Sequence, residues 1–157
     1  DFVELSKAEF YLVYPLHLAL YRHYCESPFF MNRKPETEEE FLVSTMQDKG
    51  RYFVAKQNGK QCAFLKISAS GETFVAIGNT YRHIRGAYCL PEHRGKGVYK
   101  NLLNFTISTL KREGYTRLGV NFESFNTTAR GFWLKYFAAY TNSVVRRIDE
   151  RITRLVR

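Results

Sequence analysis

The chain has 157 residues, of which 45% are hydrophobic and 16% aromatic, enough to bury the core of one domain. Lysine and arginine outnumber aspartate and glutamate by 24 to 15. The resulting net charge of +9 favours an anionic ligand without choosing among phosphates, nucleic acid and lipid headgroups. No run of about 18 apolar residues occurs, so no membrane span is expected. We expect a single domain over residues 1–157, in a chain that begins at Asp1 and could be a piece of something longer.

The three cysteines, Cys25, Cys62 and Cys89, are odd in number and far apart. No Cys-x-x-Cys pair occurs and the four histidines show no ligand spacing, so neither a disulfide framework nor a metal site is indicated. Together with the lack of a basic-then-apolar leader at the start, this pattern favours a cytoplasmic protein.

Two helices are predicted in the N-terminal third of the chain. Ser6 with Glu9 forms a capping-box pattern ahead of apolar residues at helical spacing. Pro15 then predicts either a kink or a fresh helix whose first turn holds the proline. Thr37 with Glu40 repeats the capping-box pattern ahead of a second, short helix.

The middle of the chain predicts an antiparallel meander. Residues 51–57 and 61–68 are rich in Phe, Val, Ile and Tyr, and Asn58-Gly59 between them is the pair best suited to a tight hairpin turn. A third predicted strand covers residues 82–90 and ends at a proline.

The C-terminal half predicts alternating helices and strands. A helix over 98–113 is followed by a strand over 117–123, a helix capped by Asn126 or Thr127, and a strand over 141–148. The predicted fold class is therefore α+β, with a central mixed sheet flanked by helices. In it, the antiparallel meander is followed by a parallel strand–helix–strand crossover.

The turn that follows the third predicted strand is the most informative segment. Gly95 and Gly97 lie at a helix start, which offers unpaired backbone N–H groups and the positive end of the helix dipole. Arg94, Lys96 and Lys100 add full positive charges beside them. Since ligands commonly bind at the carboxyl ends of parallel strands, this turn predicts a site for a phosphate-bearing ligand.

The spacing of these glycines excludes two common phosphate loops. A dinucleotide fingerprint requires Gly-x-Gly-x-x-Gly, and Lys100 stands where the third glycine belongs. A nucleoside triphosphate loop ends in Gly-Lys-Ser/Thr, but the nearest match, Gly114 to Gly119, is followed by Val120. Neither class fits the sequence.

The run Arg94-x-x-Gly97-x-Tyr99 resembles the acetyl-CoA-binding motif of the GNAT superfamily of N-acetyltransferases. The family pattern is Gln or Arg, two residues, Gly, one residue, then Gly or Ala, so Tyr99 stands where a small residue is expected. The segment with Asn126 and Trp133 resembles the helix that completes the family's cofactor site, with Trp133 at the usual tyrosine position. The resemblance covers nearly the whole chain.

The resemblance implies an acyltransferase that moves an acetyl group from acetyl-CoA to an amine of a small-molecule or peptide acceptor. Backbone N–H groups of the turn would bind the CoA pyrophosphate, and the backbone at the end of the preceding strand would pair with the pantetheine arm. No metal is expected, and the oligomeric state stays open, with a homodimer as one option. The implied cofactor-binding residues are Cys89, Leu90, Arg94, Gly95, Lys96, Gly97, Val98, Tyr99, Lys100 and Asn126.

Acetyl transfer requires a neutral amine and a proton donor for the departing thiolate. Because an ordinary lysine amine has a pKa of about 10.4, a carboxylate near the acceptor helps to remove its proton. Glu123, at the end of the second parallel strand, is the candidate base, with Glu92 and His93 as weaker ones. Tyr136 is the candidate acid, and Tyr140 is its runner-up.

The acceptor carries no recognisable code in the sequence. Tyr21, Tyr24, Phe29 and Phe30 are candidates for an aromatic acceptor pocket, and they fit a buried core equally well.

Two other function classes stay open. The altered residues at positions 99 and 133 permit a non-catalytic acyl-CoA-binding or regulatory domain. The net charge and the arginine-rich C-terminal tail permit a nucleic-acid binder. No aromatic residue lies among the arginines of that tail to stack on a base, so no nucleic-acid partner is expected.

Overall fold

The computed structural model describes residues 1–26, 31, 34–71 and 78–142. Its elements follow in chain order: β1 (Phe2–Glu4), the 3-10 helix η1 (Lys7–Val13), α1 (Tyr14–Cys25), α2 (Glu38–Gln47), β2 (Arg51–Gln57), β3 (Lys60–Ser68), β4 (Tyr81–Cys89), the 3-10 turn η2 (Pro91–His93), α3 (Val98–Arg112), β5 (Arg117–Val120) and α4 (Thr127–Trp133).

Five strands form one mixed sheet in the order β1-β2-β3-β4-β5. Neighbours among the first four strands are antiparallel. β5 lies parallel to β4, with Tyr81 opposite Arg117 and Ile84 opposite Val120, and α3 makes the crossover between them. This arrangement confirms the predicted α+β fold, in which a meander is followed by a parallel crossover.

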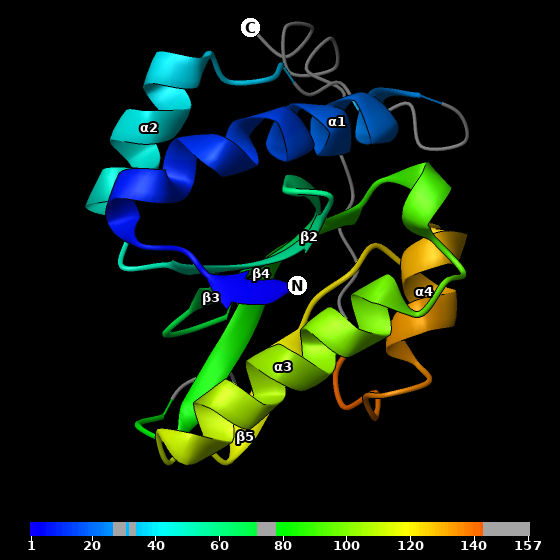
Figure 1. Cartoon of the computed structure of the whole chain (residues 1–157). Coiled ribbons are helices and arrows are strands. Elements are labelled where there is room, and N and C mark those ends of the chain that lie inside the picture. The colour runs from blue at the N-terminus through cyan, green and yellow to red at the C-terminus, as the bar shows by residue number, and fades with distance from the viewer. Residues whose placement is uncertain (27–30, 32–33, 72–77, 143–157) are drawn as a thin grey trace, which may run out of the picture.

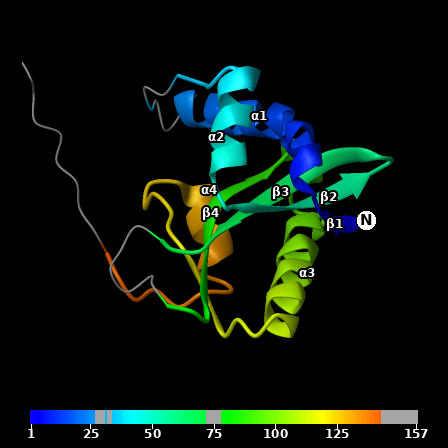
Figure 2. The same cartoon turned by 90° about the vertical axis from the view of Figure 1, so that its left-hand side faces the viewer.

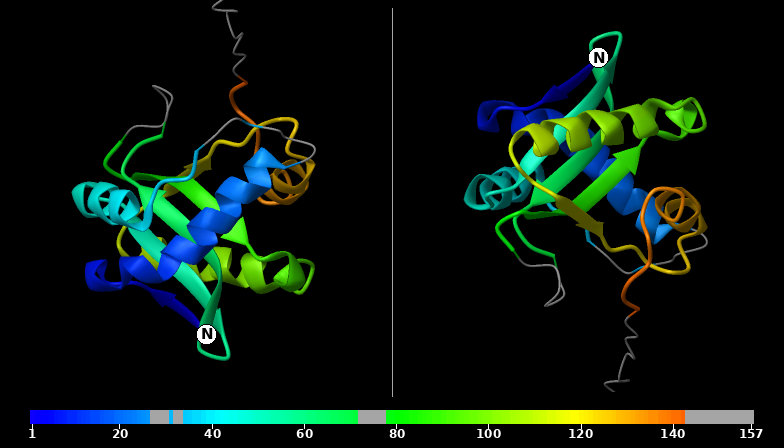
Figure 3. Two further views of the ribbon diagram at one scale, coloured as in Figure 1. Left: turned by 90° about the horizontal axis from the view of Figure 1, so that it is seen from above. Right: turned by 90° about the horizontal axis from the view of Figure 1, so that it is seen from below.

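Helices cover both faces of the sheet. α1 and α2 lie over one face, and α3 lies over the other (Figures 1 and 3). Figure 2 shows the strands between these two layers, and a buried cluster fills each side. One cluster is built around Phe41 and Tyr52 beneath α1 and α2, and the other around Leu102, Leu103 and Trp133 beneath α3 and α4. Burying each such side chain contributes about 1.5–3 kcal/mol.

The N-terminal helical region divides at Pro15, in one of the two predicted ways. The short helix η1 precedes the proline, and α1 carries it in its first turn, where a missing N–H breaks no helical hydrogen bond. Both predicted capping boxes are present. The N–H of Ser6 donates to Glu9 Oε2 at 3.0 Å, and that of Thr37 donates to Glu40 Oε2 at 2.8 Å.

The strands differ from the prediction at three places. The strand expected over 117–123 ends at Val120, because the chain no longer pairs with β4 beyond that residue. β1 has only three residues, too few for an alternating pattern to mark it, and it pairs with β2. Of the strand expected over 141–148, residues 141–142 form no strand and the rest lies outside the described residues.

Turns and helix ends mostly follow the prediction. The β2–β3 hairpin turns on Asn58 and Gly59, both with positive φ, and α3 runs to Arg112. The last helix is shorter than expected, since α4 ends at Trp133 and Tyr136 lies beyond it. A glycine in a helix interior costs about 1 kcal/mol of stability relative to alanine, so Gly131 weakens α4 just before it ends.

Candidate functional site

The turn between β4 and α3 passes through two glycines with left-handed backbone. Gly95 has φ of 71°, and Gly97, which caps α3, has φ of 77°. A side chain at either position would meet open space, so the turn requires glycine for its backbone conformation and not for lack of room.

This turn presents a cradle of backbone donors. Within the described part of the chain, the N–H groups from Gly95 to Lys100 donate to no other backbone group, and no side chain caps α3. The N–H of Asn101 makes the first bond of the helix, to the carbonyl of Gly97 at 3.0 Å. Lys96 and Lys100 are exposed. The free N–H groups, the dipole of α3 and these two cations favour an anion here.

Arg94 folds back from the turn onto the end of β4. Its Nε atom donates to the carbonyl oxygen of Cys89 at 2.9 Å, and its guanidinium lies 5.4 Å from the ring centroid of Tyr88. Beside it, the N–H of Leu90 donates to the carbonyl of Cys62 on β3 at 3.0 Å. Arg94 therefore fixes the turn against the strand in addition to bringing positive charge.

β4 and β5 separate beyond the pair formed by Ile84 and Val120. β4 itself continues to Cys89, and its partner on the other side is β3. Hydrogen-bonding directions alternate along a strand, and Leu90 is bonded to β3, so the backbone groups of Ala87 and Cys89 face the opposite edge. This edge is free of strand pairing in the described residues and leads directly into the donor cradle. We call the space along it, between β4 and α4, the slot.

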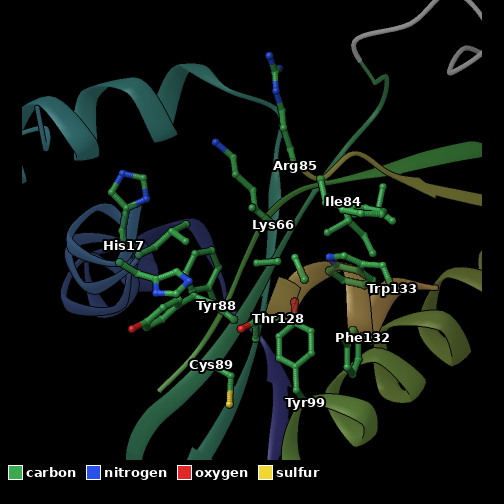
Figure 4. Close-up of a pocket in the computed structure, with 18 of the residues that line it drawn as sticks. His17, Lys66, Ile84, Arg85, Tyr88, Cys89, Tyr99, Thr128, Phe132 and Trp133 are labelled. Atoms are coloured by element: carbon green, nitrogen blue, oxygen red, sulfur yellow. The ribbon is translucent and has the colours of Figure 1, made fainter. Parts of the chain in front are cut away.

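The slot opens into a cavity of about 840 Å³. Figure 4 shows Cys89, Tyr99 and Phe132 at one end of it and Arg85 and Lys66 at the other. The cavity thus extends from the donor cradle to the face of the sheet that α1 and α2 cover.

Tyr99 fills part of the slot. Its ring rises from α3 into the space between β4 and α4 (Figure 4) and makes edge-to-face contacts with Phe132 and Trp133, at centroid distances of 4.9 and 5.9 Å. Its hydroxyl is buried and has no hydrogen-bond partner within the described residues. Burial raises the pKa of this phenol well above its ordinary value, so it stays protonated.

Cys89 also faces this region but is not suited to be a nucleophile. Burial raises the pKa of its thiol to about 11, so the thiolate is scarce at neutral pH.

The far end of the cavity is lined by polar groups that the sequence did not single out. His17 Nε2 on α1 lies 3.5 Å from Glu36 Oε2, and Lys66 Nζ on β3 lies 2.8 Å from Asp48 Oδ2. Burial lowers the pKa of His17 against the opposing effect of Glu36, so the imidazole is mainly neutral at pH 7. The predicted aromatic candidates divide: Tyr21 and Tyr24 line the cavity, and Phe29 and Phe30 lie outside the described residues.

Comparison with known families identifies this arrangement. The model of the acetyltransferase (GNAT) family matches residues 17–138. The chain belongs to this family. It is therefore an acetyltransferase, which confirms the enzymatic interpretation of the sequence. Among curated proteins, none matches the sequence.

Solved structures share the fold of this acetyltransferase at low sequence identity. A ribosomal-protein-alanine N-acetyltransferase from Brucella melitensis biovar Abortus 2308 has a TM-score of 0.67 at 20% identity, over 95% of this chain and 99% of that one. An aminoglycoside 6'-N-acetyltransferase from Acinetobacter haemolyticus gives the same four values. An aminoglycoside N-acetyltransferase in complex with CoA has a TM-score of 0.73 at 16% identity, over 94% of this chain and 93% of that one.

Glu123, Tyr136 and Asn126, which the sequence also predicts for the acetyltransferase site, line the same cavity as the residues of the turn. Glu123 follows β5 and is exposed to solvent. The Tyr136 side chain is 45% exposed and packs on Phe132, with ring centroids 5.0 Å apart. Asn126 is buried and caps α4, as predicted, because its Oδ1 atom accepts a hydrogen bond from the N–H of Ala129 at 3.0 Å.

The weaker candidates for acid and base differ in whether they line the cavity. His93 lines the cavity beside the turn, and Glu92 is exposed outside its lining. Burial raises the pKa of the Tyr81 phenol, and Tyr140 adds a smaller effect in the same direction, so Tyr140 lies beside Tyr81. Tyr140 does not line the cavity.

None of the helices that the structure describes is long and apolar enough to cross a bilayer. No group of three or more His, Cys, Asp or Glu side chains suited to a metal ion occurs within the described ranges.

Proposed function

We propose that this acetyltransferase takes its acetyl group from acetyl-CoA bound along the turn and the slot. One observation carries the proposal: the donor cradle from Gly95 to Lys100 is continuous with the open edge of β4. CoA carries a pyrophosphate between its 3'-phosphoadenosine and an extended arm with two amide groups. The pyrophosphate and the arm therefore match the two parts of the site in order. The CoA complex of a structural relative supports this choice of ligand.

The residues that would hold CoA act mainly through their backbone. The N–H groups of Gly95, Lys96, Gly97, Val98, Tyr99 and Lys100 would bind the pyrophosphate. Lys96 and Lys100 would balance its charge, and Arg94 would hold the turn in place while adding its own charge. At the slot, the backbone of Ala87 and the N–H of Cys89 would pair with the arm, since the Cys89 carbonyl already accepts a hydrogen bond from Arg94. The N–H of Leu90 is directed to β3 instead.

Glu123 and Tyr136 are the proposed acid–base pair. When bound, acetyl-CoA supplies an activated acyl carbonyl. Glu123 would take the proton that the attacking amine loses, either directly or through one water, and its exposed carboxylate suits that role. Tyr136 lies in the segment after α4 and would donate its hydroxyl proton to the departing sulfur.

The proposed acceptor is an amine of a small molecule or a peptide that enters the far end of the cavity. Aromatic rings, the contact between His17 and Glu36, and the oppositely charged pair of Lys66 and Asp48 line that end. Solved relatives carry names for both acceptor kinds, a ribosomal-protein alanine and an aminoglycoside.

Acetyl-CoA binding is the first test. Millimolar acetyl-CoA should raise the melting temperature, because a ligand that binds only the native state stabilises it. No shift at that concentration would contradict the proposal. Free thiol release on adding a panel of amines would then identify the acceptor, and binding without thiol release from any amine would favour a sensor of acyl-CoA.

A further inference from the structure

The Tyr99 hydroxyl is a buried polar group without a hydrogen-bond partner in the described part of the chain. Burying a hydroxyl without a partner costs free energy, and a ligand that supplies the partner recovers it. Tyr99 lines the cavity at its cofactor end, so a ligand bound there lies beside the buried hydroxyl.

The ring that carries the hydroxyl is held in place. Phe132 and Trp133 contact it edge to face from α4, and its backbone lies in the first turn of α3. These contacts hold the ring between α3 and α4 and direct its hydroxyl into the slot.

The walls of the slot restrict what this hydroxyl can meet. Apolar side chains of Val98, Ala129 and Phe132 line it, and the open edge of β4 supplies backbone groups on the opposite side. A slender chain that carries polar groups at intervals fits these walls. The backbone of Tyr99 belongs to the donor cradle, and its ring extends from there into the slot. The side chain therefore meets the part of a ligand that follows the pyrophosphate.

We propose that the Tyr99 hydroxyl donates a hydrogen bond to an amide carbonyl of the pantetheine arm. The side chain of Tyr99 is then a cofactor-binding group in its own right, in addition to its backbone N–H. This inference rests on the proposed acetyl-CoA site.

The protonation state of Tyr99 agrees with a hydrogen-bond donor. Burial holds the pKa of the phenol well above its ordinary value, so the hydroxyl keeps its proton throughout the neutral range. Its contribution is to bind the arm, and no bond to the cofactor is made or broken by it.

The variant Tyr99→Phe tests this inference, because it keeps the ring and removes only the hydroxyl. Calorimetry should show the Kd of CoA rising about three- to tenfold, the range for one neutral hydrogen bond. The Kd of adenosine 3'-phosphate 5'-diphosphate, which keeps the pyrophosphate and lacks the arm, should not change. Tyr11→Phe is the matched control, since Tyr11 is 50% exposed and lies outside the cavity lining. The melting temperature of ligand-free Tyr99→Phe should not fall, because no protein partner is lost.

Three outcomes would overturn the inference. Equal CoA affinity in Tyr99→Phe and the wild type would show that the hydroxyl makes no contact. Equal weakening for CoA and the armless nucleotide would place the contact outside the arm. Tighter CoA binding by Tyr99→Ala than by the wild type would show that the ring obstructs the slot. A wild type that binds no CoA would instead contradict the proposed function itself.

Discussion

The Nε atom of Arg94 donates a hydrogen bond to the carbonyl oxygen of Cys89, and this 2.9 Å contact ties the donor cradle to the end of β4. The same guanidinium lies over the ring of Tyr88. A planar side chain with a fixed fork of donors makes both contacts at once, which a lysine does not reproduce.

We expect Arg94→Lys to lose most of the affinity that Arg94→Ala loses, about tenfold for acetyl-CoA, because the position of the turn depends on the guanidinium and not on charge alone. Lys96→Ala should behave differently. Its loss should be smaller and should disappear as salt is raised, since its charge is exposed and screened. Calorimetry at two ionic strengths separates the two effects. Full rescue by Arg94→Lys would contradict the positional role.

Gly97→Val should abolish acetyl-CoA binding without unfolding the domain. Left-handed backbone costs a residue with a side chain about 1–2 kcal/mol, so the turn would shift and its N–H groups would lose their common direction. Gly114→Val is the matched control, because Gly114 also has positive φ and open space around it but lies at the other end of α3. Thermal melts should show similar small losses for both variants. Unchanged affinity in Gly97→Val would show that the turn is only a connection.

Glu123→Gln should lower kcat/KM for an amine acceptor about 100-fold at neutral pH, as expected for removal of a general base. The Kd of acetyl-CoA should stay the same. Activity of the variant should recover toward pH 9 to 10, where the amine loses its proton unaided. Glu92→Gln, in an exposed carboxylate outside the cavity lining, is the control. If Glu92→Gln has the larger effect, the assignment of the base is wrong.

Gly119→Ala should destabilise the fold by about 2 kcal/mol. A methyl group at Gly119 would collide with the hydroxyl of Tyr81, which pairs with Nδ1 of the buried His83 at 2.7 Å. Tyr81→Phe removes the colliding oxygen, so the double variant should lose less free energy of unfolding than the two single variants lose together. Chemical denaturation of all three variants measures this coupling. Strict additivity would show that the methyl group is accommodated elsewhere.

The pair formed by Arg51 and Glu113 should make stability depend on acid pH. Hydrogen bonding to Arg51 holds the pKa of Glu113 below its ordinary value of 4.5 in the folded chain. A carboxyl with a lowered folded pKa stabilises the fold above its unfolded pKa, and this stability is lost as pH falls through the folded value. Glu113→Gln should therefore flatten the fall in melting temperature below about pH 4.5. An unchanged profile would assign the acid sensitivity to other carboxyls.

The donor cradle could be predicted from sequence because its determinants are local. Gly95 and Gly97 stand beside the start of a clearly periodic helix, and one strand leads directly into it. The break in pairing after Val120 was not predictable from the alternation of residues 117–123, which continues past it. Whether a strand stays paired is decided by tertiary contacts, and no local pattern records those.

The far end of the cavity was not predictable for a different reason. His17, Lys66 and Asp48 come from three separate elements and meet only when α1 and α2 cover the sheet. The orientation of Tyr99 likewise depends on two rings of α4 that lie more than thirty positions away in the sequence. Spacing within the sequence carries no signal for such contacts.

The separation of β4 from β5 beyond Ile84 divides one strand between two tasks. Its first half is enclosed by neighbours and belongs to the framework, and its second half is an interior edge that a ligand completes. Substitutions along β4 should therefore fall into two phenotypes with a step between Ile84 and Ala87. Changes before the step act on folding alone. Changes after it also weaken the binding of the cofactor, and they still affect folding because the buried Tyr88 and Cys89 pack in the core. The position of a substitution along β4 would thus show which part of the strand only supports the fold and which part also binds the cofactor.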